Sequence, residues 1–129
     1  MSDAAFEAAA SALRHADRSR AELDERLARS GHDAVARDAA LARLEELGWL
    51  DDARTAAARA AALAGRGYGD AYIGAELTRR GLPVDEALAQ LDPEPERAAR
   101  FAARGRAWLS RRGFDLDSVP DFAADRPAG

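Results

Sequence analysis

Gly65, Gly67 and Gly69 alternate just before an expected helix, a spacing that raises the question of a phosphate-binding loop. In such loops, backbone N–H groups at a helix start bind the phosphate. A P-loop has a lysine and a serine or threonine after its last glycine, whereas Asp70 and Ala71 stand here. The dinucleotide-binding fingerprint follows a strand, whereas an alanine-rich helix is expected before these glycines. We therefore predict a joint between two helices: Gly65 or Gly67 ends one helix, and Gly69 with Asp70 begins the next.

Other residues suited to catalysis or metal binding are sparse. The chain has no cysteine, and its two histidines, His15 and His32, have no second ligand at metal-binding spacing. Asp51 and Asp52 are adjacent carboxylates, which we interpret as a helix cap rather than a metal site. No serine stands with a base that would activate it. The sequence therefore predicts no catalytic residue, no metal and no cofactor, and we expect that the protein is not an enzyme.

Arginine is the residue type whose distribution points to a function. The formal net charge is -4, yet residues 97–114 contain six arginines and no acid. If residues 97–112 form one helix, several of these arginines fall on one side, with Phe101 and Trp108 nearby. A basic face of this kind suits DNA phosphates or an acidic protein partner, and its alternative is an ordinary solvated helix face. The candidate contacts are Arg97, Arg100, Arg104 and Arg111.

The composition predicts an all-α fold. Alanine dominates the apolar residues, and aromatic residues make up only 6% of the chain. Ser19 and Glu22 have the spacing of a capping box at a helix start. From hydrophobic spacing, caps and glycine stops, we expect helices over about residues 4–16, 20–30, 33–47, 53–65, 70–80, 83–91 and 97–112. For the last of these, a bend at Gly105 is the alternative to a straight helix.

A short phrase occurs three times, as LARSG at 27–31, LTRRG at 77–81 and LSRRG at 109–113. Each phrase has a leucine of a helix and a glycine stop in the same register, which indicates tandem helical units. We expect Arg79 and Arg80, just before the second stop, to face solvent. The predicted organisation is three repeats over residues 3–48, 49–91 and 92–123, the third shortened, followed by a disordered tail over 124–129.

Several spaced motifs resemble the RecX family, bacterial regulators of the recombinase RecA. They are RSRAEL (18–23), LEELGWLDD (44–52), GYGDAYIGAELTRRGL (67–82) and RRGF (111–114), and the resemblance spans about residues 5–122. The resemblance implies three tandem three-helix units, each similar to a helix-turn-helix module, in an elongated, curved molecule. It also implies binding in the groove of the RecA–DNA filament, which damps recombination, ATP hydrolysis and the co-protease activity of RecA.

The resemblance also implies where a partner binds. The expected partner is the RecA nucleoprotein filament, with weak direct binding to DNA, and we expect the free chain to be a monomer. Tyr68 and Tyr72 are candidate stacking groups, although packing at the joint explains them equally well. The candidate filament-contacting or DNA-contacting arginines are Arg79, Arg80, Arg111 and Arg112.

Two other functions stay open at this point. A DNA-binding helical module would bind DNA without RecA, with strong salt dependence. A helical adaptor for another protein would have no effect on RecA. No stretch approaches the roughly 20 apolar residues of a membrane span, and MSDAAFEAAA lacks the pattern of a secretion signal. We therefore expect no membrane partner and a cytoplasmic location.

Overall fold

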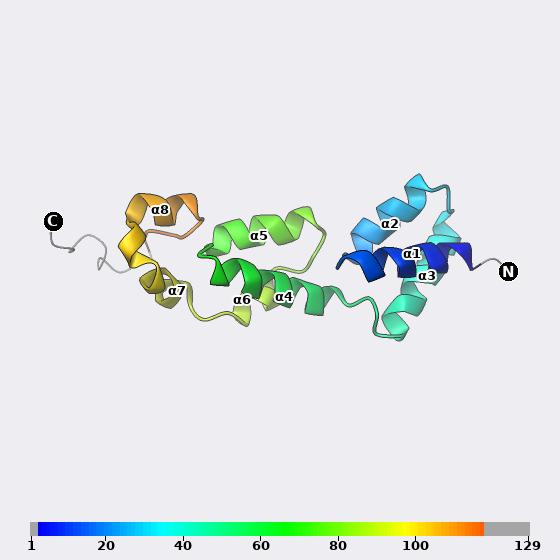
Figure 1. The fold of residues 1–129 in the computed structure, drawn as a ribbon, viewed down its shortest axis with the longest axis horizontal. Coiled ribbons are helices and arrows are strands. Elements are labelled where there is room, and N and C mark those ends of the chain that lie inside the picture. The colour runs from blue at the N-terminus through cyan, green and yellow to red at the C-terminus, as the bar shows by residue number, and fades with distance from the viewer. Residues whose placement is uncertain (1–2, 118–129) are drawn as a thin grey trace. The chain divides into compact units, whose positions relative to one another are not determined.

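The computed structural model describes residues 3–117, which form eight α-helices and one short 3₁₀ helix, with no strand among them (Figure 1). The predicted all-α class is confirmed. No helix in this part of the chain is long and apolar enough to cross a bilayer. The elements are α1 (Ala4–His15), α2 (Arg20–Arg29), α3 (Ala34–Glu46), α4 (Asp52–Gly65), α5 (Asp70–Arg79), α6 (Asp85–Ala89), α7 (Glu94–Arg100), η1 (Ala102–Arg104) and α8 (Arg106–Arg111).

Tertiary contacts divide the chain into two compact units. The first contains the chain as far as Thr55 together with Arg80–Leu82, and the second contains Ala56–Arg79 and the chain from Pro83 onward. The three predicted repeats each contain three of the observed elements, and those of the third are the short α7, η1 and α8. The repeat boundaries and the curved arrangement stay predictions. The end of the third repeat and the expected tail over 124–129 lie outside the described residues.

The first unit has a leucine core packed against alanines. Helices α1, α2 and α3 all contact one another, and small side chains on α1 allow its backbone to approach its neighbours closely. Burying these side chains supplies the main stabilisation of the unit. The buried residues of this core are Ala9, Ala10, Ala12, Leu23, Leu27, Leu41, Leu44 and Leu50.

The predicted capping box at the start of α2 is confirmed. The Ser19 hydroxyl accepts a hydrogen bond from the Glu22 backbone N–H at 3.0 Å, and the Glu22 carboxylate accepts one from the Ser19 N–H at 2.8 Å. Asp51 caps α4 by accepting from the Arg54 N–H. The carboxylate of Asp52, by contrast, accepts from the backbone N–H of Arg20 at 2.8 Å, so only one of the two adjacent aspartates caps its own helix.

The predicted glycine joint between α4 and α5 is also confirmed. Helix α4 ends at Gly65, and Gly67 has a φ of 88°, a value that favours glycine. The Tyr68 N–H then reaches back to the Leu63 carbonyl at 3.1 Å, which closes the helix end. Helix α5 begins at Asp70, directly after Gly69.

Two predicted helices have different bounds in the structure. The helix expected from Pro83 begins instead at Asp85. The helix expected over 97–112 is divided: α7 begins earlier, at Glu94, and ends at Arg100, and α8 begins at Arg106, directly after the glycine at which a bend was the alternative. Prolines are tolerated in a first helical turn, so the DPEPE segment starts a helix rather than separating two. Gly105 has a φ of 91°, which interrupts the helical conformation between η1 and α8.

The RRG sequence after α5 packs on the start of another helix. The Ser19 hydroxyl donates a hydrogen bond to the Arg80 carbonyl, and a Cβ added at Gly81 would lie 2.7 Å from the Cβ of Ala21. The carboxylate of Asp52 completes the contact by accepting from the Arg20 N–H. We call this contact, within the first unit, the first joint.

The RRG sequence after α8 makes the equivalent contact at the start of α5. The Gly69 N–H donates to the Arg112 carbonyl at 2.7 Å, and the Ala71 N–H donates to the Gly113 carbonyl at 3.2 Å. Here too the first residue of a later helix takes part, because Glu94, which begins α7, accepts from the Asp70 N–H at 2.7 Å. This second joint lies within the second unit, and its backbone contacts leave no room for a side chain at Gly69.

Gly69→Ala is expected to destabilise the protein, whereas Gly65→Ala is not. A Cβ at Gly69 would lie 2.5 Å from the Gly113 carbonyl and the Phe114 N, which are backbone atoms that cannot rotate away. A Cβ at Gly65 meets nothing within 4 Å. We expect urea unfolding to show a loss of about 1–3 kcal/mol for Gly69→Ala and a gain of up to about 1 kcal/mol for Gly65→Ala. Equal stabilities of the two variants would contradict the second joint.

Candidate partner-binding site

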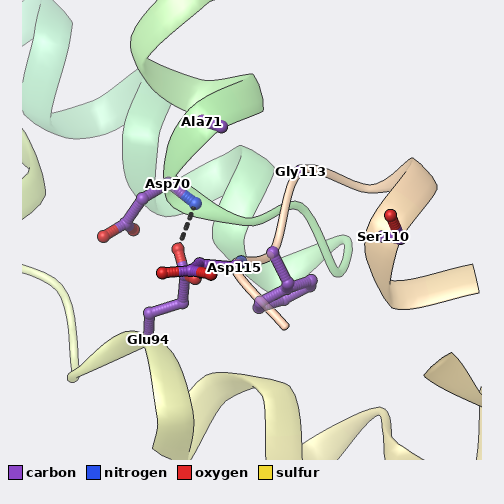
Figure 2. A pocket seen from close by; sticks show the side chains of 7 residues that line it. Asp70, Ala71, Glu94, Ser110, Gly113 and Asp115 are labelled. Atoms are coloured by element: carbon purple, nitrogen blue, oxygen red, sulfur yellow. Dashed lines mark hydrogen bonds between the residues drawn. The ribbon is translucent and has the colours of Figure 1, made fainter. Parts of the chain in front are cut away.

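A cleft of about 440 Å³ lies beside the second joint and is lined by acidic residues of different elements (Figure 2). Both oxygens of Glu94 serve backbone groups, since one accepts from the Asp70 N–H and the other from the Asp115 N–H, each at 2.7 Å. Within residues 3–117 no group of three or more histidine, aspartate or glutamate side chains is placed to hold a metal ion. The carboxylate of Glu94 therefore has a structural role, since it connects the start of α7 to the backbone at Asp70 and Asp115.

Arg97 is buried inside the second unit, and the expectation that it lies on an exposed basic face is wrong. Its side chain is 2% exposed and pairs with the carboxylate of Asp70. It also donates to the Asp92 carbonyl at 2.8 Å and to the Tyr68 carbonyl at 3.1 Å. The sequence block around it contains no acid, but the fold supplies one from α5. Arg97 thus ties α7 to the start of α5.

Arg100 also has an acidic partner, but at the surface. It pairs with Asp92, and both side chains are 56% exposed. Because α7 ends at Arg100, the later arginines of the block, Arg104 in η1 and Arg111 in α8, do not continue its face. The expected alignment of Arg97, Arg100, Arg104 and Arg111 along one helix is therefore wrong.

The two arginines of the second phrase differ in their exposure. The side chain of Arg79 is 74% exposed and pairs with Glu76. Arg80 is only 20% exposed, because it pairs with Glu22 at 3.0 Å and donates to the Asp17 carbonyl at 2.9 Å. The expectation that both face solvent is correct for Arg79 and wrong for Arg80, which belongs to the first joint.

The pKa values of the two carboxylates at the first joint, Glu22 and Asp52, are shifted in opposite directions. Burial raises the pKa of Glu22, but hydrogen bonds from Arg80 and the Ser19 N–H, together with the Arg80 charge, bring it below its ordinary value. Burial raises the pKa of Asp52, and the nearby Glu45 and Asp51 raise it further, while the Arg20 N–H opposes this. Glu22 is thus held in its charged form by the joint.

The third phrase repeats the division between one outward and one inward arginine. Arg111 is exposed, whereas Arg112 is half-buried, with its guanidinium carbon 4.3 Å from the Tyr68 ring centroid and 4.7 Å from that of Trp108. Tyr68 stacks on Tyr72 with ring centroids 4.1 Å apart. The structure thus brings Tyr68, Tyr72 and Arg112 together, with Tyr72 40% exposed.

Four arginines of the second unit form no hydrogen bond or ion pair with a carboxylate in the described part of the chain. Arg66, which sequence analysis missed, is exposed two residues before Tyr68. Its position beside the alternating glycines was the available signal. Two of them, Arg104 and Arg112, lie over aromatic rings. The best candidate residues for binding a partner are these four arginines: Arg66, Arg104, Arg111 and Arg112.

Known proteins with a similar sequence share one description. A protein of Xanthomonas oryzae pv. oryzae, described as regulatory protein RecX, is 37% identical over 122 residues, which cover 80% of this chain and 76% of that protein. A regulatory protein RecX of Halorhodospira halophila is 34% identical over an alignment 142 positions long, which covers 95% of this chain and 88% of the relative. No family model matches the chain. The chain belongs to the RecX family.

The fold agrees with this membership. The crystal structure of RecX from Lactobacillus salivarius superposes with a TM-score of 0.74, covering 88% of each chain at 17% sequence identity. At that identity the likeness concerns the fold alone. The RecX resemblance predicted from the spaced motifs is confirmed, and its members are named as regulatory proteins.

Arg97→Gln is expected to destabilise this RecX family member far more than Arg100→Gln. Removing the buried guanidinium leaves Asp70 and two carbonyls without a donor, at a cost of about 2–3 kcal/mol. The exposed Arg100–Asp92 pair contributes less than about 1 kcal/mol. Chemical denaturation of both variants checks this, and a small effect of Arg97→Gln would remove Arg97 from the structural role assigned to it.

The Glu22–Arg80 pair is expected to make stability depend on acid pH. Because the folded pKa of Glu22 is lowered, its contribution is complete above the ordinary glutamate pKa of about 4.3 and is lost as the pH falls through the folded value. The difference in unfolding free energy between wild type and Glu22→Gln should therefore shrink on acidification. In an Arg80→Gln background the same comparison should depend less on pH. A difference that stays constant from neutral to acid pH would refute the coupling.

Proposed function

We propose that this RecX family member regulates RecA by binding the RecA–DNA filament, and that it damps recombination, ATP hydrolysis and co-protease activity without catalysing a reaction itself. Membership of a family whose members are named regulatory proteins RecX supports the regulatory role. The observation that carries the binding mode is the set of arginines in the second unit that have no carboxylate partner within residues 3–117. Such arginines are available for an anionic partner.

A guanidinium group can bind a partner at low cost only when it is not already paired inside the fold. Arginines that are already paired inside the fold gain little from a phosphate or a carboxylate of a partner, because they would lose an existing pair. Arg79 is 74% exposed, but it shares the buried carboxylate of Glu76 with Arg59. Arg66 and Arg111 are exposed and have no ion pair in the described part of the chain. These two groups are therefore the first candidates for contacts to DNA phosphates or to acidic side chains of RecA.

The experiment that tests the regulatory role is the ATPase rate of the cognate RecA on single-stranded DNA. We expect inhibition by this protein, and inhibition at a substoichiometric amount would indicate action at growing filament ends. No effect at excess protein would refute the proposal. Binding to bare DNA in a salt series would then distinguish a DNA-binding module from a helical adaptor, because counterion release makes DNA binding strongly salt-dependent.

The double variant Arg66→Glu with Arg111→Glu is expected to weaken RecA inhibition by about tenfold or more, because reversing two charges replaces attraction to an anionic partner with repulsion. The matched control is Arg14→Glu with Arg26→Glu, which makes the same change in net charge at two exposed arginines of the first unit. Circular dichroism and thermal unfolding check that both variants fold. Equal loss in the two variants would show that only net charge matters and would contradict the assigned contacts.

A further inference from the structure

Aromatic rings and arginines form a continuous stack in the second unit. The Tyr68 and Tyr72 rings are stacked with an interplanar angle of 18°, and Arg112 lies over both Tyr68 and Trp108. Trp108 in turn has the Arg104 guanidinium 5.4 Å and the Phe101 ring 5.7 Å from its ring centroid. Stacked guanidinium groups of this kind make the ring surface electropositive without consuming their N–H donors.

Tyr72 ends this stack at the solvent. Its side chain is 40% exposed, whereas Tyr68, Arg112 and Trp108 are half-buried. The backbone of Tyr72 is fixed by the second joint, because a Cβ added at Gly113 would lie 2.6 Å from the Tyr72 N. An exposed aromatic ring on a fixed backbone, supported on one face by another ring, is a preorganised platform for a flat ligand.

The charges around the platform favour an anionic ligand. The side chain of Arg112 makes no hydrogen bond or ion pair within the described residues, so its guanidinium N–H donors remain available beside the rings. Arg111 and Arg66 are exposed and equally unpaired there. Of the three carboxylates that line the cleft, Asp70 is neutralised by Arg97, both oxygens of Glu94 accept backbone N–H groups, and Asp115 is exposed.

We propose that an unpaired base of single-stranded nucleic acid stacks on Tyr72, while the adjoining phosphates bind Arg111, Arg112 and Arg66. A flat, uncharged ring joined to a phosphate matches the combination of an aromatic platform and free guanidinium donors. Bases in a duplex are already stacked on both faces, so a single strand is the ligand that benefits. This inference rests on the proposed function, because the RecA–DNA filament is what would bring single-stranded DNA to Tyr72.

The test is binding of a fluorescently labelled oligothymidylate to the full chain without RecA, measured by anisotropy at several salt concentrations. Three variants are compared with wild type: Tyr72→Ala, Tyr72→Leu and Tyr72→Phe. Loss of one base–aromatic stack costs about 1–3 kcal/mol, so Ala and Leu should weaken binding by roughly five- to one-hundred-fold. Phe keeps the ring and should bind as wild type does. Leu keeps the apolar bulk, which separates loss of stacking from loss of folding.

Several outcomes would overturn the inference. They are equal affinity of wild type and Tyr72→Leu, weakened binding by Tyr72→Phe, tighter binding to duplex than to single strand, and no oligonucleotide binding by wild type. The RecA ATPase assay separates this failure from failure of the proposed function. Inhibition of RecA by wild type without binding to the oligonucleotide would refute only the stacking site, and would indicate that the platform contacts protein. Binding to the oligonucleotide without any effect on RecA would refute only the regulatory role.

Discussion

The fold depends on helix starts whose backbone N–H groups are satisfied by residues from much later in the chain. An α-helix leaves its first N–H groups without partners inside the helix. At α2, the Arg20 N–H donates to Asp52, and at α5 the Asp70 N–H donates to Glu94. An RRG turn packs on each of these helix starts: the turn after α5 packs on the start of α2, and the turn after α8 packs on the start of α5. One interaction, used twice, therefore connects segments that local sequence alone would leave independent.

This constraint decides what each arginine is free to do. Arg80 and Arg112 occupy the same position of their phrases and both turn toward a joint, whereas Arg79 and Arg111 precede them and remain exposed. Arg97 lies in the most basic part of the chain, yet it is the most buried arginine of the block because α5 presents Asp70 to it. Local charge density is thus a poor guide to binding when acids arrive from another helix.

The alternating glycines make close backbone approach possible, and the aromatic stack follows from it. A Cβ at Gly67 would lie 2.7 Å from the Trp108 ring, and one at Gly69 would lie 2.5 Å from the Gly113 carbonyl. With these side chains absent, Tyr68 and Tyr72 come beside Arg112 and Trp108. Glycine here serves helix-to-helix packing, which explains why the resemblance to a phosphate loop ended at the spacing.

The sequence alone determined the features that depend on neighbouring residues: the all-α class, the Ser19–Glu22 capping box, the helix end before Gly67 and the family. The first three follow from contacts within a few residues, which a local pattern contains, and the family follows from the order of several such patterns along the chain. Tertiary structure decided the rest, including the end of α7 at Arg100 and the burial of Arg97. The partners involved, such as Asp70 for Arg97 and Glu22 for Arg80, lie tens of residues away in the chain. No local pattern records which distant carboxylate folding brings to a guanidinium, because that pairing follows from how the helices pack.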